Sequence, residues 1–322
     1  MPLPVISIVM PLYNNEHEVK RAVASVLSQS FADFELIIVN DGSTDNSLYV
    51  VQSYRDERIS VIHQKNQGVS AARTIGIRAA RCGIIALLDA DDEWKPDFLK
   101  TIITLSEQFP ECSVFATNYF YMEQDGTVRE TIIRGLSPLP YKGVLRDYFS
   151  VAAQSDPPLW SSAVAVRKAA FESVGGFPIG ITIGEDLLTW ARLAVSHSIA
   201  YTSEQHAIFH LKSPLAGVPS RVPQEPDIVG MALKELSDAA PPDIKESVER
   251  YTALWHRMRA AMFLGLNDRT KTFREVRTSV YFDPVNIRPY TYAVLALLPN
   301  FIRSKLYDVF SYLKTERRRK IQ

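Results

Sequence analysis

The sequence predicts an α/β fold in which a mostly parallel, Rossmann-like central sheet is flanked by helices and followed by a helical C-terminal extension. Three observations lead to this prediction. Strand-like and helix-like segments alternate through the first half of the chain, as in βαβ units. Several strand-like runs are apolar without alternation, which is typical of strands covered on both faces. From about Asp227 onward, the apolar residues recur at helical spacing.

The N-terminal elements follow one another as strand and helix. Strands are predicted at residues 5–13, 34–41, 58–64 and 84–88, and helices at 16–29, 68–81 and after Pro96. The helix at 68–81 is rich in small residues, so it can lie close against a sheet. After the second strand, Ser43 or Thr44 is expected to cap the next helix.

The pattern from residue 112 onward is mixed. Strands are predicted at 112–122, 127–133 and 198–210. The stretch WSSAVAVRKAAFESVGGF predicts a strand and then a helix that stops at Gly175 and Gly176, and another helix is predicted at 184–197. Prolines then cluster at 219, 223 and 226. We therefore expect a first domain at 1–215, with halves 1–110 and 111–215, a proline-rich linker at 216–226, and a helical region at 227–322.

Composition places the chain among globular proteins with a sizeable core. It has 322 residues, of which 46% are apolar and 22% charged. Cys82 and Cys112 are too few for a disulfide framework or a metal cluster, which favours a reducing, cytoplasmic setting. The sequence shows neither a leader pattern nor an apolar run near the ~20 residues that span a bilayer. We expect no nucleic-acid partner.

Negative charge ends the predicted strand at 84–88. The stretch LLDADDEW places Asp89, Asp91 and Asp92 directly after it. Ligands of open α/β sheets bind at the carboxyl ends of strands. Residues two apart on an extended backbone point the same way, so Asp89 and Asp91 can converge on one ligand while Asp92 points elsewhere. A solvated turn before a helix is the alternative.

Other strand ends and helices supply further polar groups. Tyr13 can stack on a base or lie in the core, and Asp41 can bind a pyrimidine or a ribose or cap the turn that follows it. Arg73 can bind a diphosphate with its rigid donor fork or lie exposed on its helix. The first strand leads into neither a Walker loop nor a GxGxxG loop, so both of those phosphate-binding motifs are excluded here.

Together, five motifs resemble those of the family-2 glycosyltransferases, which have the GT-A fold. They are SIVMPLYNNE, ELIIVNDGSTDNS, NQGVSAARTIGI, LLDADDEW and GGF…GEDLLTWARL, in the family's order across residues 5–212. The resemblance implies an inverting enzyme that moves sugar from a nucleotide-sugar to a hydroxyl. It also implies a set of residues that bind the nucleotide-sugar: Pro11, Tyr13, Glu16, Asp41, Arg73, Asp89 and Asp91.

The same resemblance implies a metal, a base and an acceptor side. Asp91 is the expected ligand of Mn²⁺ or Mg²⁺, with His210 as a second candidate, and Asp89 is expected on the ribose side. Asp186 is the implied general base, and Glu185 and Trp160 are placed on the acceptor side. Without the family, Glu185 and Asp186 would simply be a favourable first helical turn, and Trp160 a core residue.

Two departures from the family pattern bear on the product. Thr74 replaces an asparagine that commonly follows the helix arginine, and the Gln-x-x-Arg-Trp motif of processive relatives does not follow Asp186. Addition of one sugar at a time is therefore favoured. The expected donor is a UDP-sugar, with GDP left open, and the expected acceptor is a glycan or lipid-linked molecule in surface polysaccharide synthesis.

The C-terminal tail carries seven basic side chains against two acidic ones from Phe301 to Gln322, together with apolar residues at helical spacing. This pattern predicts an amphipathic helix on an anionic membrane surface, which would make the protein peripheral on the inner face of the plasma membrane. Packing of the tail on this protein or on a second subunit is the alternative.

Three other functions are alternatives to a glycosyltransferase. A catalytically inactive, glycosyltransferase-like nucleotide-binding module would bind a nucleotide without turning over any donor. A sugar nucleotidyltransferase would need a glycine-rich loop after the first strand. A phosphatase with a DxD nucleophile would carry that motif on its first strand.

Overall fold

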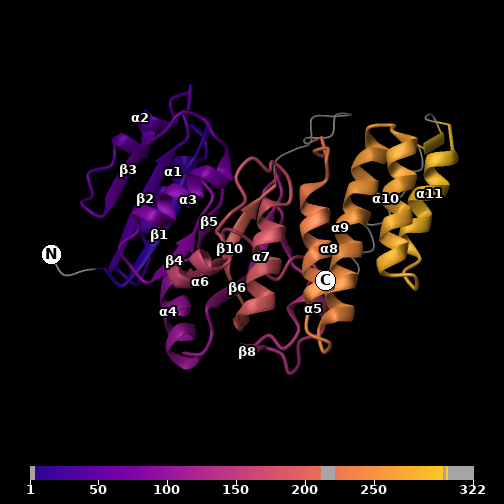
Figure 1. Ribbon diagram of the computed structural model, residues 1–322. Helices are drawn as coiled ribbons and strands as arrows, with labels where there is room; N and C mark the ends of the chain where they lie inside the picture. Colours follow the sequence, from indigo (N-terminus) through magenta and orange to yellow (C-terminus); the bar gives the residue numbers. More distant parts are fainter. Residues whose placement is uncertain (1–3, 212–221, 300–301, 304–322) are drawn as a thin grey trace. The chain divides into compact units, whose positions relative to one another are not determined.

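The computed structural model describes residues 4–211, 222–299 and 302–303 (Figure 1). Contacts between Cα atoms divide the chain into two compact units. Unit 1 comprises residues 1–213 and 231–248, and unit 2 comprises 214–230 and 249–322.

Unit 1 is built on one mixed sheet. In the part of the chain that the structure describes, the strand order is β3-β2-β1-β4-β9-β6-β10-β5, with β7 beside β6 and β8 beside β10. The strands are β1 (Ile6–Leu12), β2 (Phe34–Asn40), β3 (Ile59–His63), β4 (Ile84–Leu87), β5 (Glu93–Trp94), β6 (Val114–Met122), β7 (Val128–Glu130), β8 (Lys142–Val144), β9 (Val164–Arg167) and β10 (Ile199–His210).

The first four strands in this order, β3, β2, β1 and β4, are mutually parallel, and so are β6 and β10. The antiparallel strand β9 joins these two parallel sets. All residues of β1 and β2 are buried, as their unbroken apolar runs predict. The predicted fold class, α/β with a largely parallel sheet, is confirmed.

Helices of unit 1 lie where helical spacing predicts them, on either side of this sheet. They include α1 (Val19–Leu27), α3 (Val69–Ala79), α4 (Phe98–Gln108), α6 (Lys168–Ser173) and α7 (Glu185–Ser196). Helix α3 packs on β1 so closely that a β-carbon on Gly76 would overlap the side chain of Val9. The small residues of this helix therefore allow its close approach to the sheet.

One predicted cap is wrong. Helix α2 (Ser47–Gln52) begins after Asn46, and neither Ser43 nor Thr44 caps it. Ser43 Oγ instead accepts the backbone N–H of Asn14 (3.2 Å), and the Thr44 N–H donates to Asn14 Oδ1 (2.8 Å). The turn residues are thus bonded to the loop after β1, a contact between segments that local spacing does not reveal.

The C-terminal region is helical where the structure describes it, as predicted. Its helices are α8 (Ile228–Ala239), α9 (Lys245–Gly265), α10 (Arg269–Phe282) and α11 (Arg288–Leu297). Residues 212–221, within the expected linker, and the tail from 304 onward lie outside the described residues. Across the described chain, every helix is too short or too polar to cross a membrane.

Unit 2 contains a buried ionic network. Arg259, which is 1% exposed, makes ion pairs with Glu225 (2.6 Å), Asp227 (3.1 Å) and Glu275 (3.2 Å). His256 Nδ1 lies 2.7 Å from Glu275 Oε2. Burial, the largest single effect, raises the pKa of Glu275, but hydrogen bonds from His256 and Arg274 and the charge of Arg259 together lower it to about 2.

Candidate active site at the carboxyl edge of the sheet

Parallel pairing brings the ends of β1, β2 and β4 to one edge of the sheet in unit 1. The N–H of Asp41 donates to Leu12 O (2.9 Å), and the N–H of Leu88 donates to Val9 O (3.2 Å). Tyr13, Asp41 and Asp89 therefore follow three neighbouring strands at this edge, which is where α/β sheets bind ligands.

The loops after β1 and β2 are bonded to each other. Glu16 Oε2 accepts both the backbone N–H and the side-chain Nδ2 of Asn46 (2.9 Å each), and the N–H of Glu16 donates to Asp45 Oδ2 (3.1 Å). Pro11 is buried, whereas Tyr13 is 47% exposed. Tyr13 is therefore a surface residue of this edge and not part of the core.

Asp41 is buried and organises the segment before α3. Its Oδ1 accepts from the side chain of Gln64 (2.5 Å) and the N–H of Gln67 (2.8 Å), and its Oδ2 accepts the N–H of Gly68 (2.8 Å). Capping of the turn after β2, the alternative role for Asp41, falls to Asn40, whose Oδ1 accepts the N–H of Ser43 (3.1 Å).

Arg73 is a buried residue that joins two distant segments. Its Nη2 donates to both carboxylate oxygens of Asp89 (2.7 and 3.0 Å), and its Nη1 lies 3.7 Å from Glu185 Oε1 at the start of α7. The guanidinium also lies 5.0 Å from the ring centre of Phe177. An exposed arginine, the alternative interpretation, is excluded by its 3% exposure.

The charges around Asp89 oppose one another. Burial raises the pKa of Asp89, Arg73 works in the opposite direction, and the nearby carboxylate of Asp91 raises it further, so that the net shift is upward. The two carboxylates of the DAD turn are therefore near enough to interact, and Arg73 offsets the charge of Asp89.

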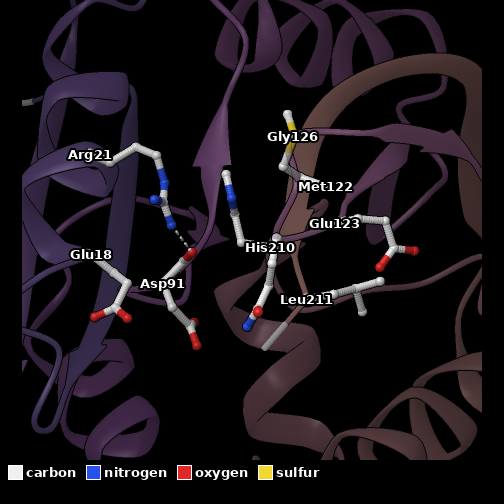
Figure 2. Close-up of a pocket in the computed structure, with 9 residues that line it drawn as sticks. Glu18, Arg21, Asp91, Met122, Glu123, Gly126, His210 and Leu211 are labelled. Atoms are coloured by element: carbon white, nitrogen blue, oxygen red, sulfur yellow. Dashed lines mark hydrogen bonds between the residues drawn. The ribbon is translucent and has the colours of Figure 1, made fainter. Parts of the chain in front are cut away.

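Asp91 lines a cavity of about 500 Å³ between the DAD turn, α1 and the ends of β6 and β10 (Figure 2). Arg21 Nη2 donates to the backbone carbonyl of Asp91 (2.6 Å) beside this cavity (Figure 2). His210 lines the same cavity, and its Nε2 lies 2.9 Å from Glu93 Oε1.

Asp92 has its own set of partners, but the extended backbone expected at residues 89–92 is not present: these residues form a turn in which the N–H of Asp92 donates to Asp89 O (3.1 Å). Asp92 is buried, and its Oδ2 accepts from Ser162 Oγ (2.5 Å) and Trp160 Nε1 (3.2 Å), while its Oδ1 accepts the N–H of His210 (3.2 Å). Burial and the neighbouring carboxylates raise the pKa of Asp92 well above its usual value. These partners lie far away in the sequence, so no local signal identifies them.

The predicted acceptor-side residues come from α7 and from the loop before β9. Asp186 is half-buried in the first turn of α7, and its Oδ1 accepts the N–H of Leu187 (2.7 Å). Trp160 is half-buried and packs against Phe209 with ring centres 4.3 Å apart. The indole N–H of Trp160 is held by Asp92, so its ring has a fixed orientation beside the DAD turn.

Asp91 offers one carboxylate to a cation at this edge. Magnesium is usually held by one or two carboxylates and completed by phosphate and water oxygens, and this arrangement fits that pattern. Three ligand-bearing side chains close enough to hold a metal occur in one place among the described residues, Asp227, His256 and Glu275 of unit 2. There the guanidinium of Arg259 already supplies the positive charge.

Comparison with known proteins agrees with this geometry. The model of the family "Glycosyl transferase family 2" matches residues 7–175. TuaG of Bacillus subtilis, a glycosyltransferase that its name places in teichuronic acid biosynthesis, is 36% identical over 148 residues, which are 45% of this chain and 58% of TuaG. Glycosyltransferase GlyG of Streptococcus pneumoniae is 34% identical over 125 residues, 38% of this chain and 42% of GlyG. The chain thus spans somewhat more than half the length of TuaG and less than half the length of GlyG.

Solved structures with the same fold extend further along the chain. S. aureus TarS 1–349 in complex with UDP-GlcNAc has a TM-score of 0.60 at 15% identity and covers 86% of this chain and 91% of that one. A structure of S. aureus TarS has a TM-score of 0.65 at 17% identity over 91% of this chain and 53% of that one. These likenesses show the fold, which is that of GT-A glycosyltransferases.

Proposed function

This chain belongs to glycosyl transferase family 2, and we propose on that basis that it moves one sugar from a nucleoside-diphosphate sugar to a hydroxyl group of its acceptor, with inversion at the anomeric carbon. The acceptor that we propose is a glycan or lipid-linked molecule in surface polysaccharide synthesis. The name of TuaG, which refers to teichuronic acid biosynthesis, supports this choice.

The donor that we propose is a UDP-sugar. Structures of S. aureus TarS with UDP-GlcNAc and with UDP support this choice through the shared fold. In this chain, exposed Tyr13 offers a ring for stacking on a base, and Asp41 lies next to it at the same edge. Pro11 and Glu16 fix the loop that carries Tyr13.

A divalent cation, Mn²⁺ or Mg²⁺, would be held by Asp91 and by diphosphate oxygens, with His210 as the second candidate ligand. Such an ion would neutralise charge on the departing diphosphate. Asp89 would face the ribose while Arg73 holds its carboxylate in place. The different surroundings of the two residues support this division of roles, since Asp91 lines the cavity and Asp89 is held by Arg73.

Asp186 would act as the general base. Its carboxylate would take the proton of the acceptor hydroxyl while that oxygen attacks the anomeric carbon from the face opposite the diphosphate. Asp186 lies in the first turn of α7, next to Glu185. Glu185, paired with Arg73, would fix the start of this helix, and Trp160 would form part of the acceptor side.

The placement of the protein on a membrane is also part of the proposal. The basic tail at 301–322 would bring it to an anionic membrane surface on the cytoplasmic side, where lipid-linked acceptors are found.

The observation that carries the proposal is the convergence of Tyr13, Asp41, Asp89 and Asp91 at one sheet edge in a chain of this family. Calorimetric titration of UDP, dTDP and GDP, with and without Mn²⁺, tests it. We expect metal-dependent binding of UDP that Asp91→Asn removes. Asp238→Asn, which alters an exposed carboxylate on α8, is the matched control and should bind UDP as the unsubstituted protein does.

The same titration separates the alternatives. If the folded protein binds none of the three nucleotides, the proposed donor site is wrong. Nucleotide binding without release of UDP from any UDP-sugar, in the presence of acceptors, would instead support the inactive nucleotide-binding module.

A further inference from the structure

An apolar surface of unit 2 faces outward instead of into a core. Around the turn between α10 and α11, the side chains of Tyr281, Val285 and Ile287 are 76%, 79% and 76% exposed. Val294 and Leu297 on α11 are 60% and 68% exposed. We call these five residues, together with Tyr290, the α10–α11 surface.

Helix α11 differs from an ordinary surface helix. Its exposed positions Tyr290, Val294 and Leu297 recur at helical spacing and form one outward stripe, while Pro289 and Ala296 are buried on another face. A surface helix normally presents polar residues outward, and one that is apolar on all sides normally has a partner. The outward stripe therefore indicates a surface that binds something.

The exposed charge within this surface is that of Arg288. From residue 281 to 299 the one acidic side chain is that of Asp283, which is buried and accepts a hydrogen bond from Asn286 Nδ2 (3.1 Å). Arg288 is exposed within the surface, and it lies close enough to Arg257 to lower the pKa of that residue, after the larger effect of burial. The exposed charged side chain of this stretch is thus a cation, Arg288.

The chain that follows adds to this positive charge. Residues 304–322 contain six basic side chains against Asp308 and Glu316. Stable attachment to a bilayer needs two signals, such as apolar insertion together with a polybasic segment. Tyrosine and arginine are also the side chains that suit the boundary between headgroups and acyl chains.

We propose that the α10–α11 surface docks on an anionic phospholipid bilayer, with Val285 and Ile287 entering the headgroup boundary and Arg288 facing the lipid phosphates. The basic tail would supply one contact with the membrane, and the α10–α11 surface would supply a second, apolar contact at a defined position. A second copy of this chain is a poorer occupant, because a two-fold interface would place Arg288 and its counterpart on the same positively charged patch.

Sedimentation of the full chain with vesicles tests the proposal. One set contains phosphatidylcholine alone, and the other contains phosphatidylcholine mixed with phosphatidylglycerol. We expect binding to the mixed vesicles that falls with salt. Val285→Glu should weaken it about tenfold by removing an apolar contact and adding negative charge, and Arg288→Gln about fivefold.

The matched control is Val222→Glu, which makes the same change at a valine of unit 2 that is 63% exposed outside this surface. We expect it to bind vesicles as the unsubstituted protein does. The proposal is overturned if no vesicle binds, if neutral vesicles bind equally well, or if Val285→Glu and Val222→Glu have the same effect. It is also overturned if sedimentation velocity shows a dimer that Val285→Glu dissociates. UDP titration of the same variants reports separately on the proposed function.

Discussion

Replacement of Arg73 by methionine removes the cation that joins the DAD turn to α7. Methionine keeps an unbranched side chain in the buried space, so the main change is the loss of charge and hydrogen bonds. The carboxylates of Asp89 and Glu185 would then remain near each other without Arg73, and Asp89 already has a raised pKa with Arg73 present.

Removal of one partner from a buried ion pair typically costs about 3–5 kcal/mol. The side chain of Asp89 is 23% exposed, so solvent screening favours the lower end, about 3 kcal/mol. For a unit of this size, a loss of about 3 kcal/mol lowers the melting temperature by about 6–12 °C. The loss should be smaller in acid, because protonation of Asp89, whose pKa is raised, removes one of the two repelling charges.

Thermal unfolding followed by circular dichroism measures this loss, and UDP titration on the folded variant measures the effect on the site. Arg73→Lys is the matched control, since it keeps the charge but has one nitrogen where Arg73 uses two, Nη2 on Asp89 and Nη1 toward Glu185. The reasoning is refuted if the free energy of unfolding of Arg73→Met lies within about 1 kcal/mol of that of the unsubstituted protein, which is the loss expected of an average substitution. It is also refuted if Arg73→Lys is destabilised as much as Arg73→Met.

Three further predictions concern other carboxylates. The pKa of Glu275 is lowered from 4.5 to about 2, which corresponds to a contribution to stability on the order of 3 kcal/mol. This contribution should be present above pH 4.5 and lost as the pH falls toward 2. Over that range, urea unfolding of Glu275→Gln should depend less on pH than that of the unsubstituted protein. Asp186→Asn should slow sugar transfer about 10²–10⁴-fold with UDP affinity unchanged in calorimetry, and equal turnover would exclude Asp186 as the base. Asp92→Asn should destabilise unit 1 by about 1–3 kcal/mol in urea, because one amide oxygen cannot accept from both Trp160 and His210, and an unchanged midpoint would contradict that account.

The strands and most helices could be predicted because their signals are local. The unbroken apolar runs of β1 and β2 and the helical spacing of α4 and α7 depend on residues that are near one another in sequence. The same holds for the DAD turn, whose position after β4 follows from one short run. The short strands β5 and β8 and the helix α5 (Tyr148–Gln154) carry too few residues for such a pattern, and they were not predicted.

The contacts of the site could not be predicted, since they join segments that are far apart. The sequence marks Arg73 as unusual in a small-residue helix, but its burial against Asp89 and Glu185 depends on how α3, β4 and α7 pack. The local sequence does not reveal the partners of Asp92 at all. Its three hydrogen-bond donors come from two segments, one about seventy residues away and one more than a hundred residues away. The roles proposed for these residues in donor and acceptor binding stay predictions.

The cross-bonded loops after β1 and β2 bear on the energetics of ligand binding. Asn14 and Glu16 on one loop hold Ser43, Thr44 and Asn46 on the other, so the rim of the site is already ordered before a ligand arrives. A flexible rim would lose conformational entropy on each binding event, at roughly 1–2 kcal/mol per residue fixed. Here that entropy is lost once, during folding, and a nucleotide bound at this rim keeps more of its contact energy as affinity.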